Sequence, residues 1–444
     1  MHRYQPGPGD RQEILRFLGL ESVEALFSSV PQEVRINSLA LAEGMSEEEV
    51  RVCFREMARK NLTSEDLPSF LGAGVYRHIG PAVMDAVLSR AEFFTAYTPY
   101  QPEVSQGTLQ AIFEFQTFVC LLTGMPLANA SLYDGATAAV EAVLMAARLR
   151  PEKKLVFVSQ ALHPHFLATL QTYAEPAGLE LCLLPWTDQG RTDLSEVVAE
   201  QAVAVLVQSP NVFGVVEDLG AVRKAAGESL AIQVVAEATS LGLLRPGGDF
   251  SFDVVCGDMQ AFGLPASFGG PHVGFFATKK EWLRQVPGRL VGQTVDANGE
   301  RAFVLTLATR EQHIRRAKAT SNICTNHSLM ALAVTVVLSL LGKKGVRELA
   351  MASHAKAAYL KSRLRSEVGR VSLAFPSSPT YNEFLILHPE PEQVLERLAQ
   401  EGILGGVATS ILADYLPRGI LVAVTEKNSR QECDRLVEAL GRVA

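Results

Sequence analysis

Short apolar segments alternate with helix-like segments over the middle of this chain, from Pro81 to about Thr320. The helix-like segments include Ala136–Arg148 and Leu219–Ala226. The apolar segments are rich in β-branched residues and are Leu155–Val158, Leu181–Leu184, Ala204–Val207, Ile232–Ala236, Val254–Val255 and Phe275–Phe276. Apolar strands joined by helical crossovers are typical of a parallel sheet buried on both faces. We therefore expect a large α/β domain around a mostly parallel sheet of about seven strands.

The regions on either side of this domain have different patterns. Residues 1–80 show no strand alternation, and Asp10 and Ser46 each precede acidic residues as helix N-caps do, which predicts a helical arm. A long apolar helix from Ser328 to Leu341 opens the last region. Its predicted strands are Val371–Phe375, Glu383–Leu387 and Gly419–Val424, and its predicted helices are Pro391–Glu401 and Ser429–Val443. The expected parts are an arm at 1–80, the α/β domain at 81–327, and a linking helix with a small α+β domain at 328–444.

Composition excludes several classes of function. The net charge of −7 leaves no sequence-wide basic field for binding nucleic acid or an anionic membrane. The apolar run at 329–341 is too short to span a bilayer and is expected to be a buried helix. The 6 cysteines are scattered without a C-x-x-C pair, which argues against a zinc site or a disulfide framework. Met1–Gly9 has no apolar signal core, so we expect a cytoplasmic protein with reduced thiols and no metal.

A glutamine, Gln260, occupies a position where a lysine is expected. It follows the apolar strand at Val254–Val255 in a polar turn, and the glycine-rich loop Gly269–Gly274 precedes the next strand. In enzymes built on the aspartate-aminotransferase-like fold (fold type I), that turn carries the lysine that binds pyridoxal phosphate (PLP) as a Schiff base. An amide cannot form this imine, because its nitrogen lone pair is delocalised into the carbonyl. The pattern therefore indicates the scaffold of a PLP-dependent transferase without its covalent anchor.

Further residues lie in the order in which a PLP-binding domain would use them. Asp134 and Gly135 open an apolar helix whose free N–H groups could bind a phosphate, although Asp134 adds a negative charge there. His163 follows a strand and could stack on a pyridine ring. Glu237 ends a buried strand, where a carboxylate would keep a pyridine nitrogen protonated. Each residue also has an ordinary alternative as a helix cap, a loop histidine or a solvent-facing carboxylate, and both roles stay open.

Two polar segments could complete a site shared with another protomer. Phe93–Gly107 combines prolines with tyrosines and threonines, which gives more rigid hydrogen-bonding groups than a linker requires. Thr320–Asn326 places hydroxyl and amide groups at a helix start, and the basic residues before it are Arg310, His313, Arg315 and Arg316. Such a set suits a phosphate or a carboxylate. The alternatives are a connector packed by its aromatic residues and an N-cap beside a solvated basic patch.

Three segments together resemble one enzyme family. Phe94–Glu103, Thr309–Arg316 and Ser321–Thr325 are similar to the P-protein of the glycine cleavage system. The likeness covers nearly the whole chain, including the opening around Gly7–Phe27. It is specifically to the N-terminal half of the family, which some bacteria make as a separate subunit 1.

The resemblance implies PLP-dependent decarboxylation of glycine and transfer of the aminomethyl group to the lipoyl arm of the H-protein. It also implies that the cofactor lysine belongs to a separate subunit 2, in an α2β2 heterotetramer, and that this chain has no catalytic lysine. The implied shared-site residues are Thr95, Tyr97, Thr98, Tyr100, Gln101, Gly269, Gly270 and His272, with Ser321, Asn322 and Thr325 reaching the partner's cofactor. The implied vestigial pocket contains Asp134, Gly135, His163, Glu237 and Gln260.

Two other functions stay open at this stage. A self-sufficient homodimeric PLP lyase or aminotransferase would use a different lysine. A non-catalytic regulatory subunit would have a degenerate pocket that binds glycine or nothing. Coenzyme attached covalently to the purified chain would favour the first, and partner activity without this chain would favour the second.

Overall fold

The computed structural model describes residues 7–36 and 38–443. The chain divides into two units, residues 1–62 and 63–444. The first contains the helices α1 (Pro8–Phe17) and α2 (Glu47–Ala58). Ser46 caps α2 as predicted, and its N–H donates in turn to Glu49. Asp10 is not the N-cap of α1: it lies inside the first turn and accepts a hydrogen bond from the N–H of Gly7 at 2.7 Å.

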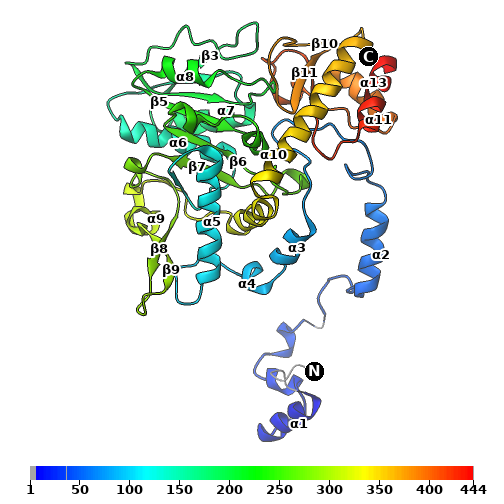
Figure 1. Ribbon diagram of the computed structural model, residues 1–444. Helices are drawn as coiled ribbons and strands as arrows, with labels where there is room; N and C mark the ends of the chain where they lie inside the picture. The colour runs from blue at the N-terminus through cyan, green and yellow to red at the C-terminus, as the bar shows by residue number, and fades with distance from the viewer. Residues whose placement is uncertain (1–6, 37, 444) are drawn as a thin grey trace. The chain divides into compact units, whose positions relative to one another are not determined.

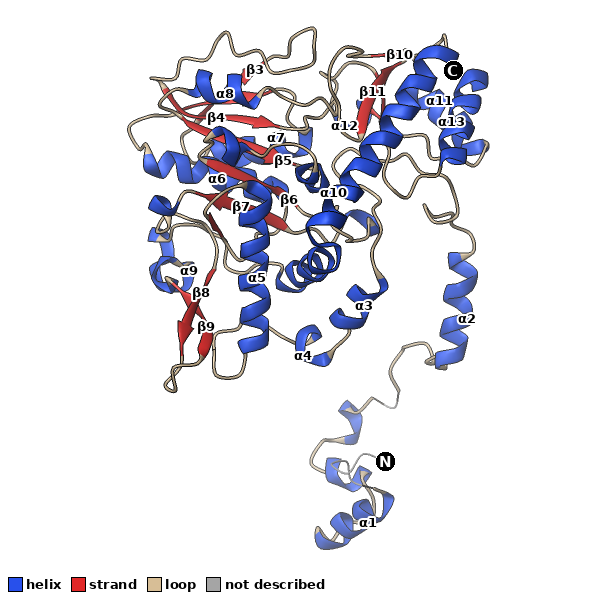
Figure 2. Ribbon diagram, in the orientation of Figure 1, coloured by secondary structure: helices blue, strands red, loops and turns tan. Residues whose placement is uncertain are grey.

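The second unit is built around a seven-stranded sheet of order β1-β7-β6-β5-β4-β2-β3 (Figure 2). Its strands are β1 (Leu127–Ala128), β2 (Leu155–Ser159), β3 (Glu180–Leu184), β4 (Ala202–Gln208), β5 (Leu230–Val235), β6 (Val254–Asp258) and β7 (Gly274–Thr278). β7 pairs antiparallel with both of its neighbours, and the pairs from β6 to β3 are parallel. The predicted mostly parallel sheet is confirmed.

Helices cover both faces of this sheet (Figure 1). On one face lie α6 (Gly135–Leu149) and α7 (Pro164–Ala174); on the other lie α5 (Gln106–Thr123), α8 (Leu219–Ala226) and the start of α10. Successive side chains of a strand point to opposite faces. In β4, Val205 and Val207 enter one core, and Ala204 and Leu206 enter the other. Burial on both sides explains why the strands read as continuous apolar runs.

A long helix leads from this large domain to the small one. α10 (Ser328–Glu367) has 40 residues and a break in helical geometry at Gly342, where φ is +58° and ψ is −177°. The sequence predicted that this helix ends near Leu341, and the break lies at the next residue. By length and composition α10 could cross a membrane, and 44% of its most apolar window is buried. Leu338 and Leu360, on either side of the break, belong to two different cores, which suits a helix joining two domains.

The small domain has a four-stranded antiparallel sheet of order β10-β11-β13-β12. Its elements are β10 (Ser372–Leu373), β11 (Glu383–Leu387), α11 (Pro391–Gln400), β12 (Val407–Ala408), α12 (Thr409–Leu412), β13 (Gly419–Ala423) and α13 (Arg430–Val443). The predicted strands and helices lie within two residues or so of these bounds, except that β10 is shorter. Elements not anticipated are α3 (Ala82–Leu88), α4 (Ala91–Phe94), β1, the hairpin β8 (Leu290–Val295) and β9 (Arg301–Thr306), α9 (Gln312–Arg315), α12 and β12.

The segment between α2 and α3 differs most from expectation. Residues 63–80 were assigned to the helical arm, but they contain no helix and belong to the second unit. Phe70 joins the small domain, where its N–H donates to Leu404 O at 2.7 Å and its carbonyl accepts from Ala423 N–H at 3.0 Å. From there the chain runs between the two domains toward α3.

Candidate functional site

The expected vestigial pocket lies beyond the carboxyl ends of the parallel strands, where open α/β sheets bind ligands. His163, Glu237 and Gln260 are 5%, 2% and 2% exposed. All of them face the same segment, Ala73–His78, which runs between the large and small domains. The structure therefore brings the predicted pocket residues together, around a stretch of the chain itself.

Gln260 makes a complete set of hydrogen bonds. Its Oε1 accepts from the N–H of Tyr76 at 3.0 Å, and its Nε2 donates to Tyr76 O at 3.0 Å and to Leu264 O at 2.7 Å. An extended backbone at Tyr76 thus pairs with the amide as it would with a neighbouring strand. Both polar atoms of the Gln260 side chain therefore have hydrogen-bond partners within the protein, without a ligand.

The ring of His163 lies against Ala73 and Gly74. Its Nδ1 accepts from His165 N–H at 3.2 Å, so Nε2 carries the proton and donates to Ala73 O at 2.9 Å. Burial lowers the pKa of His163 to about 4, which keeps the ring neutral. A Cβ on Gly74 would lie 3.2 Å from Nε2, so the backbone passes directly over the ring.

Glu237 binds an imidazole inside the protein. Its Oε2 lies 2.9 Å from Nε2 of His78, whose Nδ1 lies 2.6 Å from Glu426 of the small domain. Burial alone lowers the pKa of His78, but the two carboxylates raise it, to about 10, so the ring is a buried cation. Glu237 also accepts from Thr239 N–H at 2.8 Å. The solvent-facing alternative for Glu237 is therefore wrong.

The start of α6 is occupied by a carboxylate of the protein. Gly135 N–H donates to Asp258 Oδ2 at 2.9 Å, and Gln260 N–H donates to Oδ1 at 2.8 Å. His272 Nδ1 lies 3.0 Å from the same Oδ2, and this hydrogen bond raises the pKa of His272. Asp134 has the structural role considered for it, since it caps α6 by accepting from Thr137 N–H at 2.8 Å.

These contacts do not fit PLP bound to this chain. Each group that would recognise the coenzyme is paired with another part of the protein, and the buried Asp258 carboxylate would repel a phosphate. Sequence reasoning missed the two residues that matter most here. His78 lies outside the alternating strand and helix pattern, and Asp258 reads as an ordinary polar residue at a strand end.

A second polar cluster centres on Arg289, which is 3% exposed and directly precedes β8. Its Nη1 donates to Thr98 Oγ1 at 2.9 Å and Thr325 Oγ1 at 3.2 Å, and its Nη2 donates to Tyr100 at 2.9 Å. Glu311 Oε2 lies 3.6 Å from Nε. One buried guanidinium thus ties together the two polar segments singled out from the sequence. The only local signal was an arginine directly before the apolar pair Leu290 and Val291.

The other candidates for the shared site make no hydrogen bond to Arg289 in the part of the chain that the structure describes. Thr95, Tyr97, Gln101 and Asn322 are exposed, and Ser321 is half-buried. Gly269, Gly270 and His272 lie in the loop before β7, which His327 joins to the start of α10 by a 2.7 Å contact to His272 O. Arg310 does not present its charge for an anion: it is buried and donates to the carbonyls of Val286 and Gly288.

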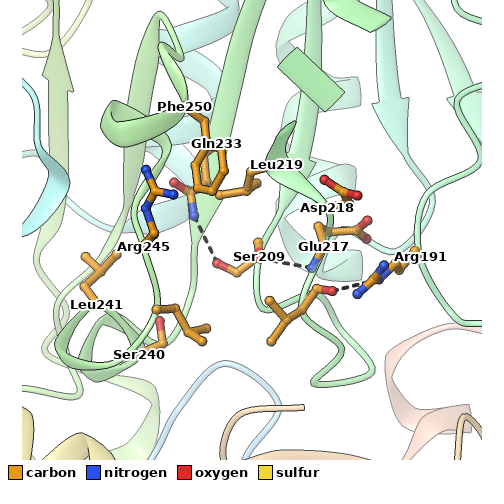
Figure 3. Close-up of a pocket in the computed structure, with 12 residues that line it drawn as sticks. Arg191, Ser209, Glu217, Asp218, Leu219, Gln233, Ser240, Leu241, Arg245 and Phe250 are labelled. Atoms are coloured by element: carbon orange, nitrogen blue, oxygen red, sulfur yellow. Dashed lines mark hydrogen bonds between the residues drawn. The ribbon is translucent and has the colours of Figure 1, made fainter. Parts of the chain in front are cut away.

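A separate pocket of about 270 Å³ lies near the ends of β4 and β5 (Figure 3). Gln233 donates to Ser209 O at 3.3 Å and accepts from Gly247 N–H at 2.6 Å, and Glu217 accepts from Thr192 and Asn211. Burial raises the pKa of Glu217. Because these inner polar groups bind one another, we assign the pocket no ligand. Among the described residues, no group of three or more His, Cys, Asp or Glu side chains could hold a metal ion.

Known proteins resemble this chain over its full length. The family described as "Glycine cleavage system P-protein" matches residues 2–440. "Probable glycine dehydrogenase (decarboxylating) subunit 1" of Geobacillus kaustophilus is 49% identical over 451 residues, covering 99% of each chain. A crystal structure of glycine decarboxylase (P-protein) in inhibitor-bound form is 44% identical, with a TM-score of 0.86, and the match covers 99% of this chain and 100% of that one.

A more distant structure bears on the fold alone. A C-DES mutant with glycine covalently linked to the PLP cofactor is 15% identical, with a TM-score of 0.61 over 86% of this chain and 98% of that one. The predicted fold-type I architecture of PLP-dependent enzymes is confirmed.

Proposed function

The chain belongs to the glycine cleavage system P-protein family, and we propose that it completes the active site of a PLP-bearing partner without binding PLP itself. It forms part of a glycine decarboxylase, as its likeness to subunit 1 proteins and to the P-protein structure indicates. The proposal adds a division of labour: the partner, subunit 2, provides the lysine and the cofactor, and this chain provides the walls of the site.

The observation that carries this proposal is the state of Gln260. An amide that is 2% exposed and bonded to Tyr76 and Leu264 neither forms an imine nor turns toward a ligand. The self-sufficient PLP enzyme considered from the sequence would use a different lysine, but the groups of this pocket that would recognise the coenzyme are paired within the chain. The anchor must therefore come from another polypeptide.

The end of α4 and the loop before α5 have the surface expected of a subunit contact. Phe94, Tyr97 and Val104 are 67%, 77% and 79% exposed, although each has an apolar body. Exposed apolar groups that gather on one loop mark interaction sites, and aromatic side chains are common there. Phe268, in the loop before β7, is fully exposed as well. These residues support a partner that covers both loops.

The chemistry assigned to this chain is positioning and exclusion of water. PLP, where the partner binds it, stabilises the carbanion that remains when glycine loses CO2. Arg289 holds Tyr100, Thr98 and Thr325 in place, and rigid phenol and hydroxyl groups keep their geometry in a closed site. Tyr97 and Asn322, which are exposed beside them, are assigned to the partner's site. The aminomethyl group then passes to the lipoyl arm of the H-protein.

This division requires one partner chain for each site; we further propose that two such pairs form an α2β2 heterotetramer in the cytoplasm, with lipoylated H-protein as a third component. A regulatory role without a contribution to the site remains the second candidate. It predicts that the partner is active alone, whereas the shared site predicts that the partner needs this chain.

Co-expression with subunit 2, followed by a glycine–bicarbonate exchange assay with lipoylated H-protein, tests the proposal. Tyr97→Phe and Asn322→Ala are expected to lower exchange on the order of tenfold or more, because each removes a hydrogen-bonding group from the shared site. Tyr173→Phe is the matched control, since Tyr173 is an exposed tyrosine at the end of α7. Unchanged exchange in both site variants, or full activity of the partner alone, would refute the proposal.

A further inference from the structure

We propose that Ala73–His78 is an internal plug that occupies the vestigial pocket in place of a cofactor, so that restoring the lysine alone would not restore PLP binding. The loss of the lysine at position 260 is then only one part of the change. The pocket is closed by the chain itself, by contacts that match the chemical features of PLP one by one.

Polar contacts within the chain, two of them made by the plug, take the places of the recognition points of PLP. A fold-type I site needs an amine for the aldehyde, a carboxylate for the pyridine nitrogen and N–H groups for the phosphate. Here the backbone of Tyr76 pairs with Gln260, and the His78 ring binds Glu237 at 2.9 Å. Asp258, outside the plug, accepts from Gly135 N–H at the start of α6. Each recognition group of the pocket is therefore satisfied internally.

The plug also fills the space between the two domains. Gly74 has a φ of +93° and passes over the His163 ring, where a coenzyme ring would stack. A Cβ on Gly72, just before the plug, would lie 2.3 Å from Glu383 Oε1 and 2.5 Å from Ala423 Cβ. Since the backbone touches both walls, no flat ring enters unless the plug leaves.

Contacts to the small domain hold the plug from its other side. Ala73 N–H donates to Glu383 Oε1 at 2.7 Å, and the Tyr76 hydroxyl donates to Glu383 Oε2 at 2.8 Å. His78 and the following N–H of Ile79 both bind Glu426. Displacing the plug breaks buried hydrogen bonds to both domains at once and leaves their donors and acceptors unpaired, which is unfavourable. The binding of added PLP would have to compensate for all of these lost hydrogen bonds.

The test uses the full chain with Gln260→Lys, incubated with PLP. We expect the same absorption spectrum as for the wild-type chain, and after borohydride reduction no stoichiometric coenzyme on the peptide that contains position 260. The lysine-bearing subunit 2 under the same conditions is the positive control. If subunit 2 does not bind PLP, the proposed function fails, whatever the result for this chain. Covalent attachment of one coenzyme per chain at the introduced lysine would refute the proposed plug.

Gln260→Lys places an amine in a buried position and can prevent folding, so a second measurement uses the wild-type chain. Hydrogen exchange at Tyr76 and its neighbours is expected to be as slow as in β6 and unchanged by saturating PLP. Fast exchange typical of an exposed loop, or exchange that PLP alters, would contradict the proposal even if the variant misfolds.

Discussion

Replacing His78 by leucine is expected to destabilise the second unit by about 3–5 kcal/mol, the cost of removing one partner from a buried ion pair. The imidazolium lies 2.9 Å from Glu237 and 2.6 Å from Glu426, and its side chain is 1% exposed. Leucine fills a similar volume but leaves two carboxylates facing each other without a cation. Burial of uncompensated charge is the cause of the loss, and packing contributes little.

The pKa of His78 gives a second route to the same magnitude. Against the cost of burial, the two carboxylates raise it from 6.5 to about 10, which corresponds to about 5 kcal/mol of preference for the charged ring in the folded state. Because the folded pKa lies above the unfolded one, this stabilisation is fully present below about pH 6.5. It is lost progressively as the pH rises toward 10.

Urea unfolding of the full chain, followed by the fluorescence of its two tryptophans, measures the effect at pH 6.5, 8 and 9.5. The gap between wild type and His78→Leu is expected to narrow as the pH rises. His388→Leu serves as the control, since His388 is only half-buried at the end of β11 and pairs with no carboxylate among the described residues. A loss below about 1 kcal/mol at pH 6.5, or a gap independent of pH, would refute the buried cation.

Three further outcomes follow from the same contacts. Burial raises the pKa of Glu383 to about 7 from 4.5, so stability falls as the pH rises through that window; Glu383→Gln removes this dependence and gains up to about 3 kcal/mol at pH 8 in urea unfolding. Arg289→Met lowers exchange by the reconstituted enzyme on the order of tenfold or more, and Arg289→Lys recovers only part, because a compact ammonium lacks the planar fork by which two Nη atoms reach three separate hydroxyls. Gly214→Ala, with φ +76° and a Cβ that would lie 1.8 Å from Glu383 O, abolishes soluble expression, which gel analysis of soluble and insoluble fractions detects.

Local sequence patterns determined much of the secondary structure of this protein. Apolar runs of strand length between amphipathic segments predicted the parallel sheet, because burial on both faces leaves its mark on consecutive residues. The N-cap at Ser46 and the helix at Leu219–Ala226 were likewise legible from neighbours in the chain. Short elements such as β1 and β12 left no such pattern, since two residues cannot show a period.

The amide at position 260 is also read directly from the sequence, and it led to the proposal that this chain does not anchor PLP. The contacts that take the place of the lysine could not be predicted from the sequence. Tyr76 and Gln260 are 184 positions apart, and His78 is 159 positions from Glu237. Contacts over such distances impose no periodicity on the residues between them, so 63–80 looked like the end of a helical arm. Only the closing of two domains around that segment made His78 a buried cation, and only the folding of the large domain made Arg289 the tie between two loops.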